Sequence, residues 1–319
     1  MKSEDSLATV LLVSRLAAEG LQPLKAGEFW RLHDQVGGPG VLLGRTADAL
    51  VRELGLAVDL AARVVGLLER ATAMAFELER LDQSGIATLT PSDEAYPARL
   101  LARLGPKAPP VLHAAGDVAL LRRAGVGVVG SRDVAPEGAE VARAAAERAA
   151  RMGLPLVSGG ARGVDRLAMG GAYQAGGSVV GVLADSLVRT LKGSDVRRAV
   201  LGGSTVLCTP YGPDAPFSPG NAMGRNKLIY AQSLVTLVVA SDLETGGTWS
   251  GAVEAVKDGF GRVAVWRGAG EGPGNAAIEK RGAVAVGSVD GLESLLHEKE
   301  PEPPPRERAA QPSLFGPPS

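Results

Sequence analysis

The chain has 319 residues, of which 45% are hydrophobic and 4% aromatic, and its formal net charge is −1 at pH 7. This length allows one large or two modest domains, and the near-zero charge excludes a globally basic surface, so that any nucleic-acid site must be a local patch. A single cysteine, Cys208, and three widely separated histidines exclude a disulfide scaffold and predict no metal or other cofactor, and no apolar run reaches the ~18 residues of a membrane span.

Residues 1–85 are predicted to form a small all-helical domain. The acidic residues ahead of Leu7 are not those of a signal peptide, so we expect a cytoplasmic protein. Apolar residues at helical spacing start at Leu7, Thr46 is a suitable N-cap for a helix over Ala47–Leu54, and Asp59 is the expected cap of one long helix over Leu60–Leu81. Short helices joined by glycine turns resemble helix-hairpin-helix and sterile-alpha-motif-like modules. A packing or dimerisation module without a ligand of its own remains the alternative.

Residues 86–297 are predicted to form a Rossmann-like α/β domain. Its first part, to about residue 125, is a connector with short strands near Ile86–Thr90 and Val111–Asp117, because its prolines exclude a long helix. From Val126 onward, short β-branched runs alternate with helical segments, which is typical of a mostly parallel, doubly wound sheet with both faces buried. The expected strands are Val126–Gly130, Leu154–Ser158, Ser178–Leu183, Thr205–Cys208, Leu234–Ala240, Arg262–Trp266 and Ala283–Val286. The expected helices are Glu137–Met152, Val164–Ala175, Asp195–Leu201, Met223–Gln232, Thr248–Asp258 and Gly274–Lys280.

Two glycine-rich turns that contain arginine follow consecutive predicted strands. Small residues let backbone N–H groups approach an anion, the following helix N-terminus adds partial positive charge, and arginine offers a fork of donors. A plain turn whose arginine pairs with a surface carboxylate would explain one such segment, but two at the same sheet edge favour phosphate binding. The turn residues expected at phosphate are Gly130, Ser131, Arg132, Ser158, Gly159, Gly160, Arg162 and Gly163.

Two further segments are expected at the same edge. Arg225, Asn226 and Lys227 lie just inside a predicted helix and suit a phosphate together with a base edge or sugar. Gly247 and Thr248 open another helix after a glycine turn. The sequence has no Walker lysine motif, no dinucleotide fingerprint with a ribose acid and no persuasive nucleophile–base arrangement. It therefore predicts a phosphate-binding protein without a catalytic pair, and not an enzyme.

Taken in order, these segments resemble the DNA-processing protein A (DprA, also called Smf) family over roughly residues 85–290. The resemblance implies a dimeric, extended Rossmann-like fold that binds single-stranded DNA. It also implies that the protein protects the strand and loads a RecA-type recombinase in DNA uptake, natural transformation and recombination. The family's pocket residues would be Arg132, Ser158, Gly159, Arg162, Arg225, Asn226 and Lys227. The sequence also departs from the family pattern: Met169 replaces a usual histidine, Thr209 replaces a usual acidic residue, and Leu183–Leu187 replaces a common Gly-Thr-Gly-Leu-Asp stretch.

Residues 298–319 are predicted to be a disordered tail rich in proline and charge. Within it, Gln311, Leu314 and Phe315 are similar to the anchors of the peptide by which bacterial proteins dock on the replicative sliding clamp. A frayed tail without a partner remains the alternative.

A nucleotide-binding enzyme or sensor is the alternative function. Related Rossmann-like phosphoribohydrolases carry a Gly-Gly-x-Gly-Thr-x-x-Glu turn, which Gly246, Gly247 and Thr248 with Glu254 copy in part. In this chain Glu254 is too far along the helix to match that turn.

Overall fold

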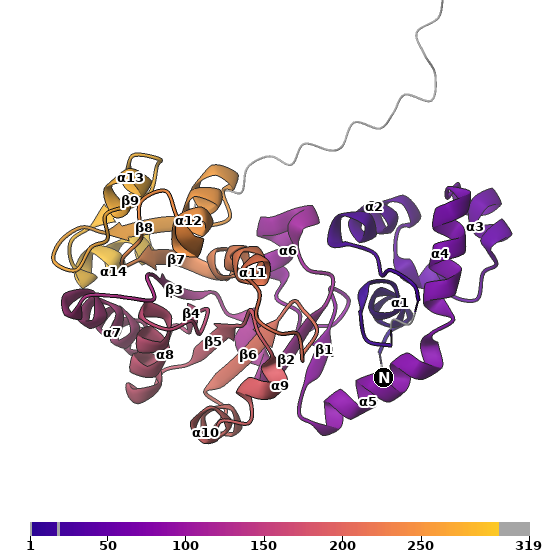
Figure 1. Cartoon of the computed structure of the whole chain (residues 1–319), viewed down its shortest axis with the longest axis horizontal. Helices are drawn as coiled ribbons and strands as arrows, with labels where there is room; N and C mark the ends of the chain where they lie inside the picture. The colour runs from indigo at the N-terminus through magenta and orange to yellow at the C-terminus, as the bar shows by residue number, and fades with distance from the viewer. Residues whose placement is uncertain (1, 18–19, 300–319) are drawn as a thin grey trace, which may run out of the picture.

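The computed structural model describes residues 2–17 and 20–299 (Figure 1). The predicted clamp-binding residues Gln311, Leu314 and Phe315 lie outside the described residues. Within the described ranges, no helix combines the length and the apolar character that crossing a bilayer requires.

The described residues build one nine-stranded sheet in the order β1-β2-β6-β5-β4-β3-β7-β8-β9. Strands β3 to β9 pair in parallel, whereas β1 pairs antiparallel with β2, and β2 antiparallel with β6. The strands are β1 (Ala87–Leu89), β2 (Leu112–Gly116), β3 (Gly125–Val129), β4 (Leu156–Ser158), β5 (Val179–Val182), β6 (Thr205–Thr209), β7 (Ser233–Val238), β8 (Arg262–Trp266) and β9 (Val284–Val286). The predicted Rossmann-like, mostly parallel sheet preceded by helices is confirmed.

Helices cover both faces of the sheet, as expected for parallel strands (Figure 1). On one face, α7 (Pro136–Arg151) packs through buried alanines against α8 (Val164–Gln174), and α14 (Val289–His297) lies beside them. On the other face lie α11 (Pro219–Gln232) and α12 (Gly246–Asp258). The remaining helices of this part are α6 (Ala98–Leu104), η2 (Gly105–Lys107), η3 (Val118–Arg122), α9 (Leu187–Thr190), α10 (Ser194–Leu201) and α13 (Asn275–Glu279). The sequence did not predict α6, α9 or α14.

The N-terminal helices lie beyond the β1–β2 edge of the sheet (Figure 1). They are α1 (Glu4–Val13), α2 (Ala26–Val36), η1 (Pro39–Leu42), α3 (Ala47–Leu54), α4 (Val58–Leu68) and α5 (Ala71–Gln83). Thr46 caps α3 as predicted, with its hydroxyl 3.3 Å from the Ala49 nitrogen. Trp30 donates its ring N–H to the Ala108 carbonyl at 2.8 Å, so these helices dock directly on the connector. The division of the chain at residue 85 stays a prediction.

The predicted single helix over Leu60–Leu81 is wrong. It is two helices, with Asp59 inside the first turn of α4 and a break between α4 and α5 next to Arg70. The Arg70 guanidinium donates to the Leu67 carbonyl and to carbonyls at the C-terminal end of α1, those of Leu11 and Ser14. Because both helices bury apolar residues against the same interior, the helical spacing of apolar residues continues across the break and hides it.

We expect the buried His113, on β2, to make the free energy of unfolding fall at acid pH. The side chain is 3% exposed, with Nδ1 3.1 Å from the Thr88 hydroxyl. Burial lowers the pKa of His113 from 6.5 to about 4, nearby Lys2 lowers it further, and Asp214 opposes the shift. Between those pH values the unfolded chain binds a proton that the folded chain does not, so stability must fall as the pH drops, by about 3 kcal/mol at pH 4.

The measurement is denaturant unfolding at about pH 7 and about pH 4. The variant His113→Gln keeps a polar partner for Thr88 but cannot titrate, so it is expected to lose markedly less stability than the parent chain. Equal losses in the two proteins would contradict the role given to His113.

Candidate nucleic-acid interface

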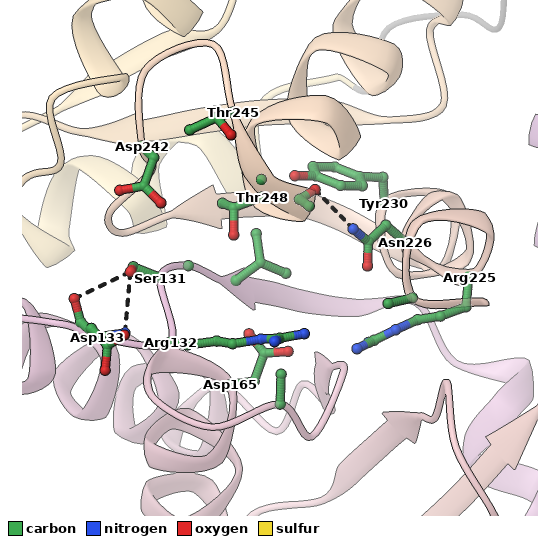
Figure 2. Close-up of a pocket in the computed structure, with 16 residues that line it drawn as sticks. Ser131, Arg132, Asp133, Asp165, Arg225, Asn226, Tyr230, Asp242, Thr245 and Thr248 are labelled. Carbon is green, nitrogen blue, oxygen red and sulfur yellow. Dashed lines mark hydrogen bonds between the residues drawn. The ribbon is translucent and has the colours of Figure 1, made fainter. Parts of the chain in front are cut away.

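The candidate site lies where the strand order reverses. From β3 the chain moves to β4 on one side, whereas β7 pairs with β3 on the other side. Ligands of open parallel sheets bind beyond the carboxyl ends of the strands at such a reversal. The turns after β3, β4 and β7 meet there, under the first half of α11 (Figure 2).

The turns after β3 and β4 are locked together. Gly163 has φ +84° and ψ −132°, and a Cβ atom at this position would overlap the Ser131 carbonyl oxygen and lie 2.6 Å from that of Arg132. Val164 donates its N–H to the same Ser131 oxygen at 3.2 Å, and Ser131 donates its own N–H to Ala240, after β7, at 2.8 Å. The three turns therefore form one unit that a side chain at residue 163 would push apart.

Two serines that the sequence predicted to bind phosphate use their hydroxyls for hydrogen bonds within the fold. The buried Ser158 hydroxyl donates to the Val128 carbonyl at 2.6 Å. The Ser131 hydroxyl donates to the Asp133 carbonyl at 3.1 Å and accepts from the Asp133 N–H at 3.2 Å. These hydroxyls hold the turns, and the backbone and arginines of the turns face the open side.

Arg225 is the most unusual residue of the site. It is 4% exposed, and its guanidinium lies so close to Gly159 that a Cβ atom there would overlap it. Within the part of the chain that the structure describes, its Nε and Nη1 atoms have no hydrogen-bond partner. Buried polar groups are normally hydrogen-bonded, because leaving one unpaired is costly. Figure 2 shows Arg132 and Arg225 approaching from opposite sides with their guanidinium groups pointing toward one another.

Asp165 provides the opposing charge behind the turns. Its side chain is 5% exposed, and its carboxylate accepts the Gly159 N–H at 3.1 Å. Burial raises the pKa of Asp165, and the charge of Arg225 together with backbone N–H donors opposes that rise. Burial likewise lowers the pKa of Arg225, and Asp165 opposes that change. Asp165 thus supports the charged form of Arg225 without occupying its free N–H groups.

A basic groove, here called the arginine groove, runs past this pair with a volume of about 310 Å³. Its lining residues are Arg132, Gly159, Gly160, Ala161, Arg162, Arg166, Ala184, Asp185, Phe217, Ala222 and Arg225. Exposed Arg162 pairs with Asp133 at 2.8 Å, and Arg166 donates to the Gly160 carbonyl at 3.2 Å. Arg132 lies 5.5 Å from the ring centre of Phe217, which is 50% exposed. The groove therefore combines four arginine side chains with an aromatic ring.

A second hollow, here called the carboxyl-edge pocket, adjoins the groove and has a volume of about 330 Å³. It shares Arg132, Ala161, Ala222 and Arg225 with the groove, so a ligand in one can extend into the other. Its other residues are Val129, Gly130, Ser131, Asp133, Asp165, Asn226, Tyr230, Asp242, Thr245, Gly246, Gly247 and Thr248. The predicted segments after β3, at α11 and at α12 thus meet here. Asn226 donates its side-chain N–H to the Gly247 carbonyl at 2.9 Å.

Lys227 does not join the groove. It lines a separate cavity of about 470 Å³ between the N-terminal helices and the sheet. The reason is geometric, since two positions along an α-helix differ by about 200° around its axis, and Arg225 faces the groove. Burial lowers the pKa of Lys227, while nearby Glu254 opposes the change and Lys107 adds to it.

Glu254, the carboxylate of the enzyme alternative, lies 3.7 Å from the Lys107 ammonium and outside the residues that line the groove and the pocket. Nowhere in residues 2–17 and 20–299 do three or more His, Cys, Asp or Glu side chains gather into a group that could hold a metal.

Sequence reasoning missed several residues of the site. Asp165 was not among the residues expected at phosphate, and its carboxylate holds the Gly159 turn. No pattern in the sequence distinguished four further residues of the groove and pocket from ordinary loop, core or surface residues: Arg166, Phe217, Tyr230 and Asp242.

A family model described as DNA recombination-mediator protein A matches residues 87–293, more than half of the chain. The chain belongs to this family. Among curated relatives, it is 27% identical over 179 residues to DNA processing protein DprA of Bacillus subtilis (strain 168), covering 56% of this chain and 59% of the relative. It is 31% identical over 161 residues to protein Smf of Escherichia coli (strain K12), covering 50% of this chain and 42% of the relative. The chain thus spans about half the length of the relatives it matches.

Solved structures of the family share this fold. DNA processing protein A from Streptococcus pneumoniae aligns with a TM-score of 0.60 at 22% identity, covering 85% of this chain and 98% of that chain. DNA processing protein A from Helicobacter pylori aligns with a TM-score of 0.53 at 24% identity, covering 66% of this chain and 95% of that chain.

Met169 and Thr209, which depart from the family pattern, both make contacts within the fold. The Met169 sulfur would be 3.9 Å from a Cβ atom on Gly160, so this side chain supports the floor from below. Thr209 is buried at the end of β6, where its hydroxyl accepts the Tyr211 N–H at 3.3 Å. Both positions are filled by residues that pack or hydrogen-bond within the fold.

Proposed function

We propose that this protein binds single-stranded DNA with the strand's phosphates in the arginine groove. The observation that carries the proposal is Arg225, a buried arginine with free N–H groups that faces Arg132 across the glycine turn. An oxyanion between the two guanidinium groups would satisfy both. Membership of a family of DNA recombination mediators supports the proposal, as does the fold shared with the Helicobacter pylori protein, which has been described in terms of its single-stranded DNA binding mode.

A single strand suits this site better than a duplex does. The guanidinium of Arg225 is buried against Gly159, and a flexible strand can bring a phosphate close to it more readily than a rigid double helix can. Phe217 presents an exposed ring at the same groove, and unpaired bases stack on such rings. Phosphate contacts carry little sequence information, so binding is expected with strands of any sequence.

The proposed site residues are the groove and pocket residues that the sequence predicted and the fold brings together: Gly130, Arg132, Gly159, Gly160, Arg162, Arg225, Asn226, Gly247 and Thr248. Ser131, Ser158 and Gly163 act through the scaffold in this proposal, and Lys227 lies apart.

The family resemblance extends the proposal to the whole chain. A helical domain of residues 1–85 would precede a DNA-binding domain of residues 86–297, and residues 298–319 would carry a sliding-clamp peptide. The protein would act as a cytoplasmic homodimer that shields single-stranded DNA and loads a RecA-type recombinase in uptake or repair of DNA, without catalysing a reaction itself.

The test compares oligo-dT with a duplex of equal length by fluorescence anisotropy at about 50 and about 200 mM salt. Four arginines line the described groove, and neutralising one phosphate each predicts that affinity for the single strand falls about 50-fold between these salt concentrations. The duplex is expected to bind more weakly at both. Equal affinity for the two DNAs, or affinity independent of salt, would overturn the proposal.

A further inference from the structure

The carboxyl-edge pocket differs in charge from the groove that it adjoins. The groove is lined by arginines, whereas the far side of the pocket carries the exposed carboxylate of Asp242 beside the start of α12. A Cβ atom on Gly246 would be 3.8 Å from an Asp242 carboxylate oxygen, so this carboxylate lies close to the amides that open the helix. A phosphate at this end would meet negative charge. The start of α12 therefore does not suit the phosphate that the sequence assigned to Gly247 and Thr248.

Two side-chain acceptors, Asp242 and Asn226, lie on this side of the pocket. Among the described residues, Asp242 forms no side-chain hydrogen bond or ion pair, so both of its oxygens are open to a ligand. The Asn226 side chain donates an N–H to the Gly247 carbonyl, which fixes the orientation of its amide. Its side-chain oxygen therefore points into the pocket (Figure 2). A ligand that brings N–H donors can satisfy both of these acceptors.

Nucleobases differ in this respect. Adenine, cytosine and guanine carry an exocyclic amino group, and a carboxylate is a natural acceptor for the cytosine amine, whereas thymine presents a carbonyl oxygen and a methyl group instead. The pocket volume of about 330 Å³ lies at the lower end of the ~300–1,000 Å³ range of small-ligand sites. The shared wall at Arg132 and Arg225 would place such a base next to a phosphate in the groove.

We propose that the carboxyl-edge pocket takes one unstacked nucleobase of the bound strand, and that Asp242 favours bases with an exocyclic amino group over thymine. This inference rests on the proposed single-stranded DNA binding and adds a preference to it. Asp242 acts as the specificity-determining residue, and Asn226, on α11, provides a second acceptor.

The experiment measures the affinities of oligo-dC and oligo-dT of equal length at one salt concentration. The parent chain is expected to bind oligo-dC about five-fold more tightly or better. Asp242→Asn replaces the carboxylate with a carboxamide, which can also donate to the thymine carbonyl, so the ratio of the two affinities is expected to fall to about one. Glu244→Gln is the matched control, because it removes an exposed carboxylate from the same loop but outside the pocket, and it should leave the ratio unchanged.

Equal binding of the two oligonucleotides by the parent chain would overturn this inference while leaving single-stranded DNA binding in place. A preference that survives in Asp242→Asn, or that disappears equally in Glu244→Gln, would overturn it as well. If neither oligonucleotide binds the parent chain, the proposed function itself fails.

Discussion

The double variant Arg132→Ala/Arg225→Met is expected to bind oligo-dT at least about 100-fold more weakly than the parent chain. In the proposed binding mode each guanidinium makes a charge-assisted contact with a phosphate, worth about 1.5–3 kcal/mol. Both guanidinium groups line the same groove. Methionine at residue 225 fills the buried channel without a charge. Asp165, whose pKa burial already raises, can then take up a proton rather than stay as an unpaired buried anion. Fluorescence anisotropy over a salt series measures the effect.

The salt dependence separates a lost phosphate contact from a damaged fold. Losing two cationic contacts should make the slope of log affinity against log salt shallower by about 1.4 for a single strand. The control is Arg197→Ala, which removes an exposed arginine from α10, on the side of the molecule away from α11 (Figure 1). Unchanged affinity in the double variant, or an equal loss in the control, would contradict the placing of phosphates in the arginine groove.

The sequence was informative about this site because of how parallel sheets are built. Each glycine turn follows its strand directly, and the carboxyl ends of parallel strands share one edge. Knowing that Arg132 and Gly159 follow consecutive strands was therefore enough to expect them side by side, before any contact was known. The sheet and its covering helices could also be predicted from the sequence. Strands that are buried on both faces are apolar throughout, and the segments between them have helical spacing of apolar residues.

Side-chain direction could not be predicted in the same way. Arg225 and Lys227 are only two positions apart in the sequence, but which of them faces the groove depends on how α11 turns its buried residues toward the sheet. Ser158 belongs to a strand whose side chains all point into the interior, so its hydroxyl was never free to reach a ligand. The break beside Arg70 depends on carbonyls that follow α1, far away in sequence. These features follow from tertiary contacts that no local pattern encodes.

Gly163→Ala is expected to lower the free energy of unfolding by about 4 kcal/mol or more. The residue has φ +84° with ψ −132°, which side chains rarely adopt, and the added Cβ atom would overlap the Ser131 carbonyl oxygen. That oxygen belongs to the neighbouring turn and already accepts the Val164 N–H, so neither turn can yield without breaking this contact. Denaturant unfolding gives the loss, and the salt series gives the accompanying loss of DNA affinity.

Gly176→Ala separates the cost of placing a side chain at positive φ from the cost of the close contact with Ser131. Gly176 also has a positive φ, +74°, but a Cβ atom there would meet nothing within 4 Å, so its substitution should cost only about 1 kcal/mol. The excess in Gly163→Ala therefore measures how tightly the turn after β4 is pressed against the turn after β3. If the two variants lose equal stability, the turns are not locked, and Arg132 and the Gly159 floor must be positioned independently of each other. If the excess appears together with weaker DNA binding, the contact that stabilises this edge of the sheet is also the one that positions its arginines.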